Sequence, residues 1–294
     1  MTTSGMPLWQ QPVAVEDAVV LGSRQVGAYR NLAVQAPGIV EHARPGHFVA
    51  VAVGGPTSGL LLRRAFSIHR VEQEAVELVV APHAPGTEWI TGRAIGDRLD
   101  VVGPLGRPFP LPVDPVPCVL VGGGYGSAPL FWLADELRAR GCRVEIVLGA
   151  ASADRLFGVD QATACADAVT VTTDDGSAGV RGWVSDVLPE VLRRSEAAVV
   201  YACGPMAMLR SVTEQATAHG AVAQVAVEEA MACGVGVCMT CVMPVVGRDG
   251  RTRMLRSCID GPTFRGDRVR WDAFGADGIC RVPDDCVGAP TGGH

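Results

Sequence analysis

The sequence predicts an α/β plus β protein with three parts: an N-terminal antiparallel β-barrel, a Rossmann-like α/β domain and a small C-terminal module. Residues 13–112 hold short strand-like segments separated by turn residues, which is typical of a small barrel or sandwich. Residues 117–149 read as a strand, a glycine turn, a helix and a second strand, the order of a βαβ unit. Three cysteines follow at C-x4-C-x2-C spacing, and Cys258 comes later as a fourth.

Composition and charge exclude several classes of protein. The 294 residues are enough for two domains and a small module. A formal net charge of −6 gives no basic surface, so we expect no nucleic-acid partner. No apolar run approaches the roughly eighteen residues of a membrane span, so we expect no membrane partner. Ten cysteines, without a signal-peptide pattern at residues 1–10, favour a reduced, cytoplasmic protein.

The first domain, expected over residues 1–112, consists of short strands. Residues 29–34 alternate apolar and polar side chains, which is the period of a half-buried strand. A turn at residues 43–46 precedes the next apolar run. No helical periodicity separates these segments, so we expect an antiparallel barrel. Its strands are expected at 29–34, 47–53, 65–71, 75–81 and 97–102.

Arg64, Ala65, Phe66 and Ser67 form a motif inside this domain. On a strand, Arg64 and Phe66 share one side. The guanidinium can bind a pyrophosphate through two hydrogen bonds, and the Ser67 hydroxyl or backbone can reach the edge of a flavin ring. Taken alone, the motif is explained equally well by a basic edge strand.

Two further motifs make the flavin interpretation stronger. Gly86 and Thr87 stand at the start of a short predicted helix, where backbone N–H groups favour phosphate. Residues 96–106 close the domain as G-D-x-L-x-x-x-G-P-x-G. Together the three motifs resemble the flavin domain of the ferredoxin–NADP reductase superfamily, where they occur in this order. The resemblance implies that FAD is bound by Arg64, Ala65, Phe66, Ser67, Gly86 and Thr87, beside the strand residues Val79, Val80 and Ala81.

The second domain is expected over residues 113–225. The glycine turn between its first strand and first helix lies where a dinucleotide pyrophosphate binds in a βαβ unit; a tight turn is the alternative. Strands at 168–173 and 197–202 also lead into loops at their carboxyl ends, where ligands of open α/β sheets bind. The second loop resembles the superfamily's loop near the nicotinamide, and we assign its cysteine no acid–base role. The residues expected to bind NAD are Gly122, Gly123, Gly124, Gly126, Cys203, Gly204, Pro205 and Met206.

The residues after the second strand of this domain give an indication of whether NAD or NADP is bound. Superfamily members that prefer NADP often carry a basic residue just after the second strand. Residues 149–154 contain none, although Arg155 is close. Because a 2′-phosphate favours a guanidinium partner, the sequence favours NAD.

The C-terminal cysteines have the spacing of a plant-type [2Fe–2S] site, in which four thiolates hold two irons. Gly234 and Gly236 lie inside the first interval, where a loop around a compact cluster needs positive φ and close backbone approach. The alternatives are a zinc site, which usually pairs two short C-x2-C segments, and a set of buried thiols. We expect the module over residues 226–274 and a tail over 275–294. The remaining cysteines are expected in the core (Cys118, Cys142 and Cys165) or as free thiols of the tail (Cys280 and Cys286).

The segments Glu228-Glu229-x-Met231-x-Cys233-Gly234 and Cys258-x-Asp260-Gly261-Pro262-x-Phe264 resemble the electron-transfer subunits of NAD-dependent (class 1B) dihydroorotate dehydrogenase. The resemblance implies an oxidoreductase subunit of pyrimidine biosynthesis that carries FAD, a [2Fe–2S] cluster and NAD. Its partner would be an FMN-containing catalytic subunit, two of each forming a heterotetramer, and this chain would supply no catalytic side chain. The cluster ligands would be Cys233, Cys238, Cys241 and Cys258.

The sequence departs from that family at several places, which include a slightly longer stretch between Cys241 and Cys258 and an unmatched tail after Phe274, and other functions compete. Ala65 stands where the family usually has proline, and Val80-Ala81 replaces an aromatic–basic pair. One alternative is an NAD(P)H-handling subunit of a hydrogenase or of a ferredoxin-linked transhydrogenase. A redox sensor that uses the cluster as a switch and a zinc protein are the others.

Overall fold

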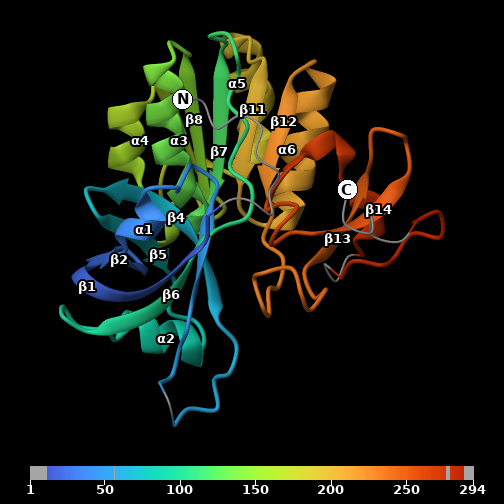
Figure 1. Cartoon of the computed structure of the whole chain (residues 1–294). Coiled ribbons are helices and arrows are strands. Elements are labelled where there is room, and N and C mark those ends of the chain that lie inside the picture. Colours follow the sequence, from blue (N-terminus) through green and yellow to red (C-terminus); the bar gives the residue numbers. More distant parts are fainter. Residues whose placement is uncertain (1–11, 56, 276–278, 288–294) are drawn as a thin grey trace.

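The computed structural model describes residues 12–55, 57–275 and 279–287. It confirms the predicted fold class. The barrel lies at the lower left of Figure 1, the large sheet with its helices at the top, and the C-terminal module at the right. None of the described helices is long and apolar enough to cross a membrane.

The N-terminal domain is a closed antiparallel barrel. Alternation along its strands turns side chains such as Val20, Leu32 and Ile68 inward, where they are fully buried. Two short helices, α1 (Pro37–Val40) and α2 (Pro85–Thr91), lie in its connections. The strand order is β1 (Ala14–Val26), β2 (Tyr29–Gln35), β5 (Ala75–Val80), β4 (Arg64–Glu72), β3 (Phe48–Val51) and β6 (Arg98–Leu105), which closes on β1.

The second domain is a seven-stranded sheet covered on both faces. Helices α3 (Ala128–Ala139) and α4 (Val159–Cys165) pack on one face. Helices α5 (Val184–Ser195) and α6 (Met206–Ala218) pack on the other. The strand order is β10 (Val180–Arg181), β9 (Ala168–Thr173), β8 (Val144–Ala150), β7 (Cys118–Gly123), β11 (Val199–Cys203), β12 (Val222–Ala226) and β15 (Thr263–Arg265). All neighbours are parallel except β15, which is antiparallel to β12.

Side chains of the barrel join the two domains. The Tyr29 hydroxyl donates a 2.7 Å hydrogen bond to the backbone oxygen of Arg155. Arg70 of β4 forms a 2.8 Å ion pair with Asp135 of α3. Because Arg155 belongs to the short helix η3 (Ala153–Arg155) that follows β8, the barrel lies against the carboxyl ends of the central strands.

The C-terminal module is built on a two-stranded hairpin of β13 (Val242–Val246) and β14 (Thr252–Arg256). Strand β15 and the short helices η4 (Gly266–Arg268) and η5 (Trp271–Ala273) follow. The tail returns to the hairpin, where the Val287 N–H donates to the backbone oxygen of Thr252. The module therefore contacts both domains: β15 extends the sheet, and Cys241 and Cys258 pack against Phe48 of the barrel.

Candidate functional site

Two adjacent cavities lie where the three parts of the chain meet. The first, of about 580 Å³, is a cleft at the carboxyl ends of β7, β8 and β9. The second, of about 420 Å³, lies between the barrel and the cysteine loop. Tyr125, His83 and Glu228 line both cavities and so form their shared wall.

The second cavity collects part of the residues predicted to bind the flavin. Ala65, Phe66, Ser67 and Val79 line it. Ala81 lines the neighbouring cleft instead, and the Val80 side chain is fully buried in the barrel core. These β4 and β5 residues present a largely apolar wall, which suits the body of an aromatic ring system.

Arg64 lies outside that cavity but beside Gly86. A Cβ added at Gly86 would stand 2.7 Å from Arg64 Nε, so the guanidinium can lie close to the backbone only because position 86 is glycine. Arg64 Nη1 donates to the Leu62 oxygen at 2.7 Å, and no carboxylate of the described residues forms an ion pair with it. A half-buried guanidinium without a counter-charge fits a phosphate.

Thr87 shapes the turn beside Arg64. Its hydroxyl accepts hydrogen bonds from the N–H groups of His83 and Ala84, both at 3.1 Å. It donates to the Ala84 oxygen at 3.0 Å. With its hydroxyl used in this way and its side chain buried, Thr87 holds the backbone around Gly86.

The glycine turn and the loop after β11 pack directly against each other. A Cβ at Gly123 would lie 2.8 Å from Pro205 Cδ, and one at Gly126 would lie 2.8 Å from the Cα of Gly204. Glycine at these positions therefore lets the two loops approach. Of the residues predicted to bind NAD, Gly123, Gly124 and Pro205 line the cleft, and Gly126 and Cys203 line the flavin-side cavity. The other three line neither: Gly122 packs on Ser127, Gly204 on Gly123, and Met206 on the core under α5 and α6.

The shared wall contains residues that the sequence reasoning missed. Tyr125 is 40% exposed and packs edge-on against Tyr29, with 5.7 Å between ring centroids. Burial raises its pKa to about 12, so the phenol is neutral. Glu228 is open to the cleft yet surrounded by protein, and this desolvation raises its pKa. In the sequence, Tyr125 interrupts a run of glycines. This interruption was the signal that could have identified it as a site residue.

Asp174 and Trp183 also line the cleft. The loop that begins at Asp174 was expected to contact NAD, whereas Trp183 received no role from the sequence. Asp174 follows β9, and Trp183 precedes α5 with 66% of its surface exposed. Arg155 reaches the same cleft. An acidic group and an exposed indole plane beside a dinucleotide site can bind ribose hydroxyls and a base, respectively.

The four predicted cluster cysteines form two pairs. Hydrogen bonds link Cys233 with Cys238 and Cys241 with Cys258. In the part of the chain that the structure describes, no three His, Cys, Asp or Glu side chains surround a point as one metal ion requires. Two thiolate pairs instead match the four thiolates and two irons of a [2Fe–2S] cluster.

Hydrogen bonds favour the thiolate form at Cys238 and Cys241, whereas the contact with Cys241 raises the pKa of Cys258. The Cys233 sulfur accepts from the N–H groups of Val235 and Val237, at 3.5 Å and 3.4 Å. The Thr240 hydroxyl lowers the pKa of Cys238 to about 6. The Cys258 thiol lowers the pKa of Cys241 to about 6 in the same way. Because thiolates are the metal-binding form, this environment is suited to ligation.

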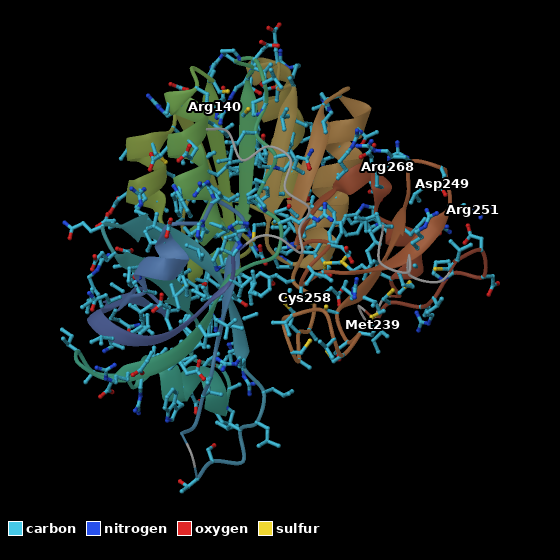
Figure 2. All side chains as sticks on the ribbon, viewed as in Figure 1. Arg140, Met239, Asp249, Arg251, Cys258 and Arg268 are labelled. Carbon is cyan, nitrogen blue, oxygen red and sulfur yellow. The ribbon has the colours of Figure 1, made fainter. Side chains whose placement is uncertain are left out.

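The loop that carries the first three cysteines turns through three residues with positive φ, two of them glycines. Gly234, Gly236 and Met239 have φ values of +73°, +82° and +60°. Val235, Val237 and Met239 are exposed on it. Figure 2 shows Cys258 and Met239 on the lower side of the module, whereas Asp249 and Arg251 lie at the tip of the hairpin.

Phe48 and Met231 connect the flavin-side cavity to the cysteines. Both line that cavity, and both pack in one apolar cluster with Cys241 and Cys258. The nucleotide cleft, the flavin-side cavity and the cysteine site are therefore contiguous and occur in that order.

Several known proteins are similar to this chain in sequence. Residues 228–270 match the family described as the iron–sulfur cluster binding domain of dihydroorotate dehydrogenase B. The electron transfer subunit of dihydroorotate dehydrogenase B (NAD(+)) from Desulforamulus reducens is 34% identical over 239 residues, which cover 81% of this chain and 90% of that protein. The Geobacillus kaustophilus subunit is 38% identical and covers 79% and 88%. The Streptococcus thermophilus subunit is 34% identical and covers 87% and 99%.

Solved structures agree on the architecture. An NADH-dependent reduced ferredoxin–NADP oxidoreductase superimposes with a TM-score of 0.77 at 30% identity, over 88% of this chain and 91% of that one. A ferredoxin–NADP⁺ reductase from Neisseria gonorrhoeae with bound FAD and NADP has a TM-score of 0.59 at 17% identity, over 71% and 92%. The second likeness concerns the fold alone.

Proposed function

This chain belongs to the family of electron-transfer subunits of NAD-dependent dihydroorotate dehydrogenase B, and on that premise we propose that it passes electrons from a dihydroorotate-oxidising partner subunit to NAD. The observation that carries the proposal is the order of the sites. Tyr125, His83 and Glu228 separate the nucleotide cleft from the flavin-side cavity. Phe48 and Met231 separate that cavity from the cysteines. The function places the protein in pyrimidine biosynthesis as an oxidoreductase subunit.

FAD, when bound, can exchange electron pairs with NAD and single electrons with an iron–sulfur cluster, so it belongs between the two. We assign Arg64 to its pyrophosphate, with the backbone at Gly86 allowing close approach and Thr87 holding that turn. Ala65, Phe66, Ser67 and Val79 face the ring system, and Val80 and Ala81 contribute backbone. No side chain is required as a nucleophile or base.

NAD is assigned to the cleft. Gly123, Gly124 and Pro205 line it, while Gly122, Gly126, Cys203, Gly204 and Met206 shape the two loops around it. Burial raises the pKa of Cys203 well above its usual value, so it stays a neutral thiol beside the flavin. Asp174 favours NAD over NADP because a carboxylate repels a 2′-phosphate.

Cys233, Cys238, Cys241 and Cys258 are assigned as ligands of the [2Fe–2S] cluster. Their arrangement as two pairs supports two irons over a single zinc ion. The adjoining flavin and nucleotide cavities support an electron carrier over a sensor without substrate.

The partner is a catalytic dihydroorotate dehydrogenase subunit, as the relatives' name implies. We propose that it carries FMN and that two copies of each subunit assemble. All ten cysteines are free in the structure, which supports a reduced, cytoplasmic setting. We propose no nucleic-acid partner, because the formal net charge is −6, and no membrane partner.

A second function is favoured by one observation. The structural relative at 30% identity and a TM-score of 0.77 is a ferredoxin–NADP oxidoreductase that depends on NADH. Isolation of the native complex separates the two functions. The first is supported by co-purification of an FMN-containing subunit and by reduction of NAD⁺ with dihydroorotate. Co-purification of a ferredoxin-linked or hydrogenase subunit, with no dihydroorotate turnover, would refute it.

A further inference from the structure

The hydroxyl of Ser257 is buried and lacks a hydrogen-bond partner. Ser257 has no exposed surface, and its Oγ is one of the few buried side-chain atoms of the described residues without a partner. Leaving a buried hydroxyl unpaired is unfavourable. A group that belongs beside it should therefore accept its hydrogen bond.

The backbone places Ser257 directly opposite Cys241. Strands β13 and β14 pair with Val242 opposite Arg256, so the next pair outward is Cys241 and Ser257. The Ser257 N–H donates a 2.9 Å hydrogen bond to the Cys241 oxygen, so the two backbones stay in contact just beyond the ends of the strands. In an antiparallel ladder, opposite residues turn their side chains to the same face, with Cβ atoms about 5 Å apart. Both side chains are buried.

We propose that Ser257 donates its hydroxyl hydrogen bond to the Cys241 sulfur of the assembled cluster and thereby raises the cluster's reduction potential. This inference rests on the proposed function, since it needs Cys241 as a cluster ligand. Hydrogen bonds to ligand sulfurs stabilise the more negative, reduced state and are a principal means of tuning iron–sulfur potentials. Ser257 touches no substrate and acts only through Cys241.

Two features argue that this bond adjusts the potential and is not needed for the fold. The Cys241 thiol already has Cys258 as a partner in the folded chain. The hydrogen bond between Ser257 and Cys241 in the folded chain uses backbone atoms alone.

The test is a redox titration of the purified complex in which the electron paramagnetic resonance signal of the reduced cluster is measured at each potential. In Ser257→Ala, we expect the ratio of reduced to oxidised cluster at a fixed potential to fall about tenfold. For a one-electron couple this is a downward shift of about 59 mV. Ser257→Thr keeps the hydroxyl and should retain the wild-type potential. Ser257→Val introduces a side chain of the same shape as threonine but without the hydroxyl, and its potential should resemble that of Ser257→Ala.

The control is Ser195→Ala, which removes a buried hydroxyl that is paired with Leu192 at the end of α5 and should leave the potential unchanged. If Ser257→Ala does not assemble a cluster, the Thr and Val variants make the comparison on their own. An intact cluster whose potential is the same with and without the hydroxyl overturns the inference. A wild-type complex without a [2Fe–2S] spectrum instead overturns the cluster assignment itself.

Discussion

Two neighbouring arginines, Arg63 and Arg64, differ in their electrostatic partners. Arg63 forms a 2.6 Å ion pair with Asp100. Arg64 has only backbone oxygens as partners among the described residues and lies against Gly86. On this contrast we propose that Arg64, and not Arg63, binds phosphate.

Arg64→Ala should weaken the binding of FAD by about 1.5–3 kcal/mol, the range for a hydrogen bond to a charged group. The dissociation constant of FAD, measured by fluorescence titration of apoprotein, checks this. Arg63→Ala is the matched control and should leave FAD affinity unchanged. Equal affinity in Arg64→Ala and wild type would contradict the assignment.

Asp174 and Asp175 also form a matched pair. Asp174 faces the nucleotide cleft, whereas the Asp175 carboxylate accepts hydrogen bonds from Ser177 at 2.9 Å and 2.6 Å. Asp174→Asn removes the charge that would face a 2′-phosphate. We expect kcat/KM for NADPH relative to NADH to rise about tenfold, or ~1.4 kcal/mol. Asp175→Asn should not change this ratio, and an unchanged ratio in Asp174→Asn would assign the preference elsewhere.

At the scale of elements, strand β3 links the stability of the barrel to the redox site. His47 stands just before β3 and is buried, which lowers its pKa to about 4. Its Nδ1 accepts the Arg44 N–H at 3.1 Å. The next residue, Phe48, touches both the flavin-side cavity and the cysteines.

This histidine predicts a loss of stability in mild acid. The unfolded chain, with a histidine pKa of about 6.5, binds a proton that the folded protein excludes down to about pH 4. The free energy of unfolding should therefore fall by about 3 kcal/mol from His47 as pH drops through this window. Urea unfolding at pH 7 and pH 5 measures how strongly the free energy of unfolding depends on pH. This dependence should become weaker in His47→Asn but not in His219→Asn, which alters an exposed histidine. The same pH dependence in His47→Asn and wild type would exclude His47 as the cause.

Local patterns predicted most elements, and the misses have physical reasons. The period of two identified β2, the series of short segments between turn residues identified β4 and β5, and the strand–glycine turn–helix pattern identified β7 and α3. Helix α5 was not predicted, although Val184, Leu188 and Val191 repeat on one face, because Pro189 interrupts the pattern. Strand β15 has three residues and is fixed by pairing with β12 from far along the chain, which no local window contains.

The candidate site was predictable only where the chemistry resides in contiguous residues. Cysteine spacing predicted which four cysteines the structure brings together, but not that they form two pairs. The shared wall of Tyr125, His83 and Glu228 joins three distant segments, so it emerges only once the barrel packs on the sheet. The same holds for the contact of Arg64 with Gly86.

For the whole molecule, the sites lie in a linear order, so damage at one end should spare the other. Cys238 is exposed on the cysteine loop and is far in sequence from Arg64 and Gly86. Cys238→Ser removes one of four thiolates and should abolish the [2Fe–2S] absorption and resonance signals while FAD stays bound. NADH should still reduce the flavin and, through it, a dye. Dihydroorotate-dependent reduction of NAD⁺ by the complex should fall below about one hundredth of wild type, because single electrons no longer reach the flavin.

The control is Cys286→Ser, which alters a tail thiol and should leave both reactions intact. Retention of the cluster spectrum in Cys238→Ser would refute the ligand assignment, and retention of full turnover without a cluster would refute the proposed order.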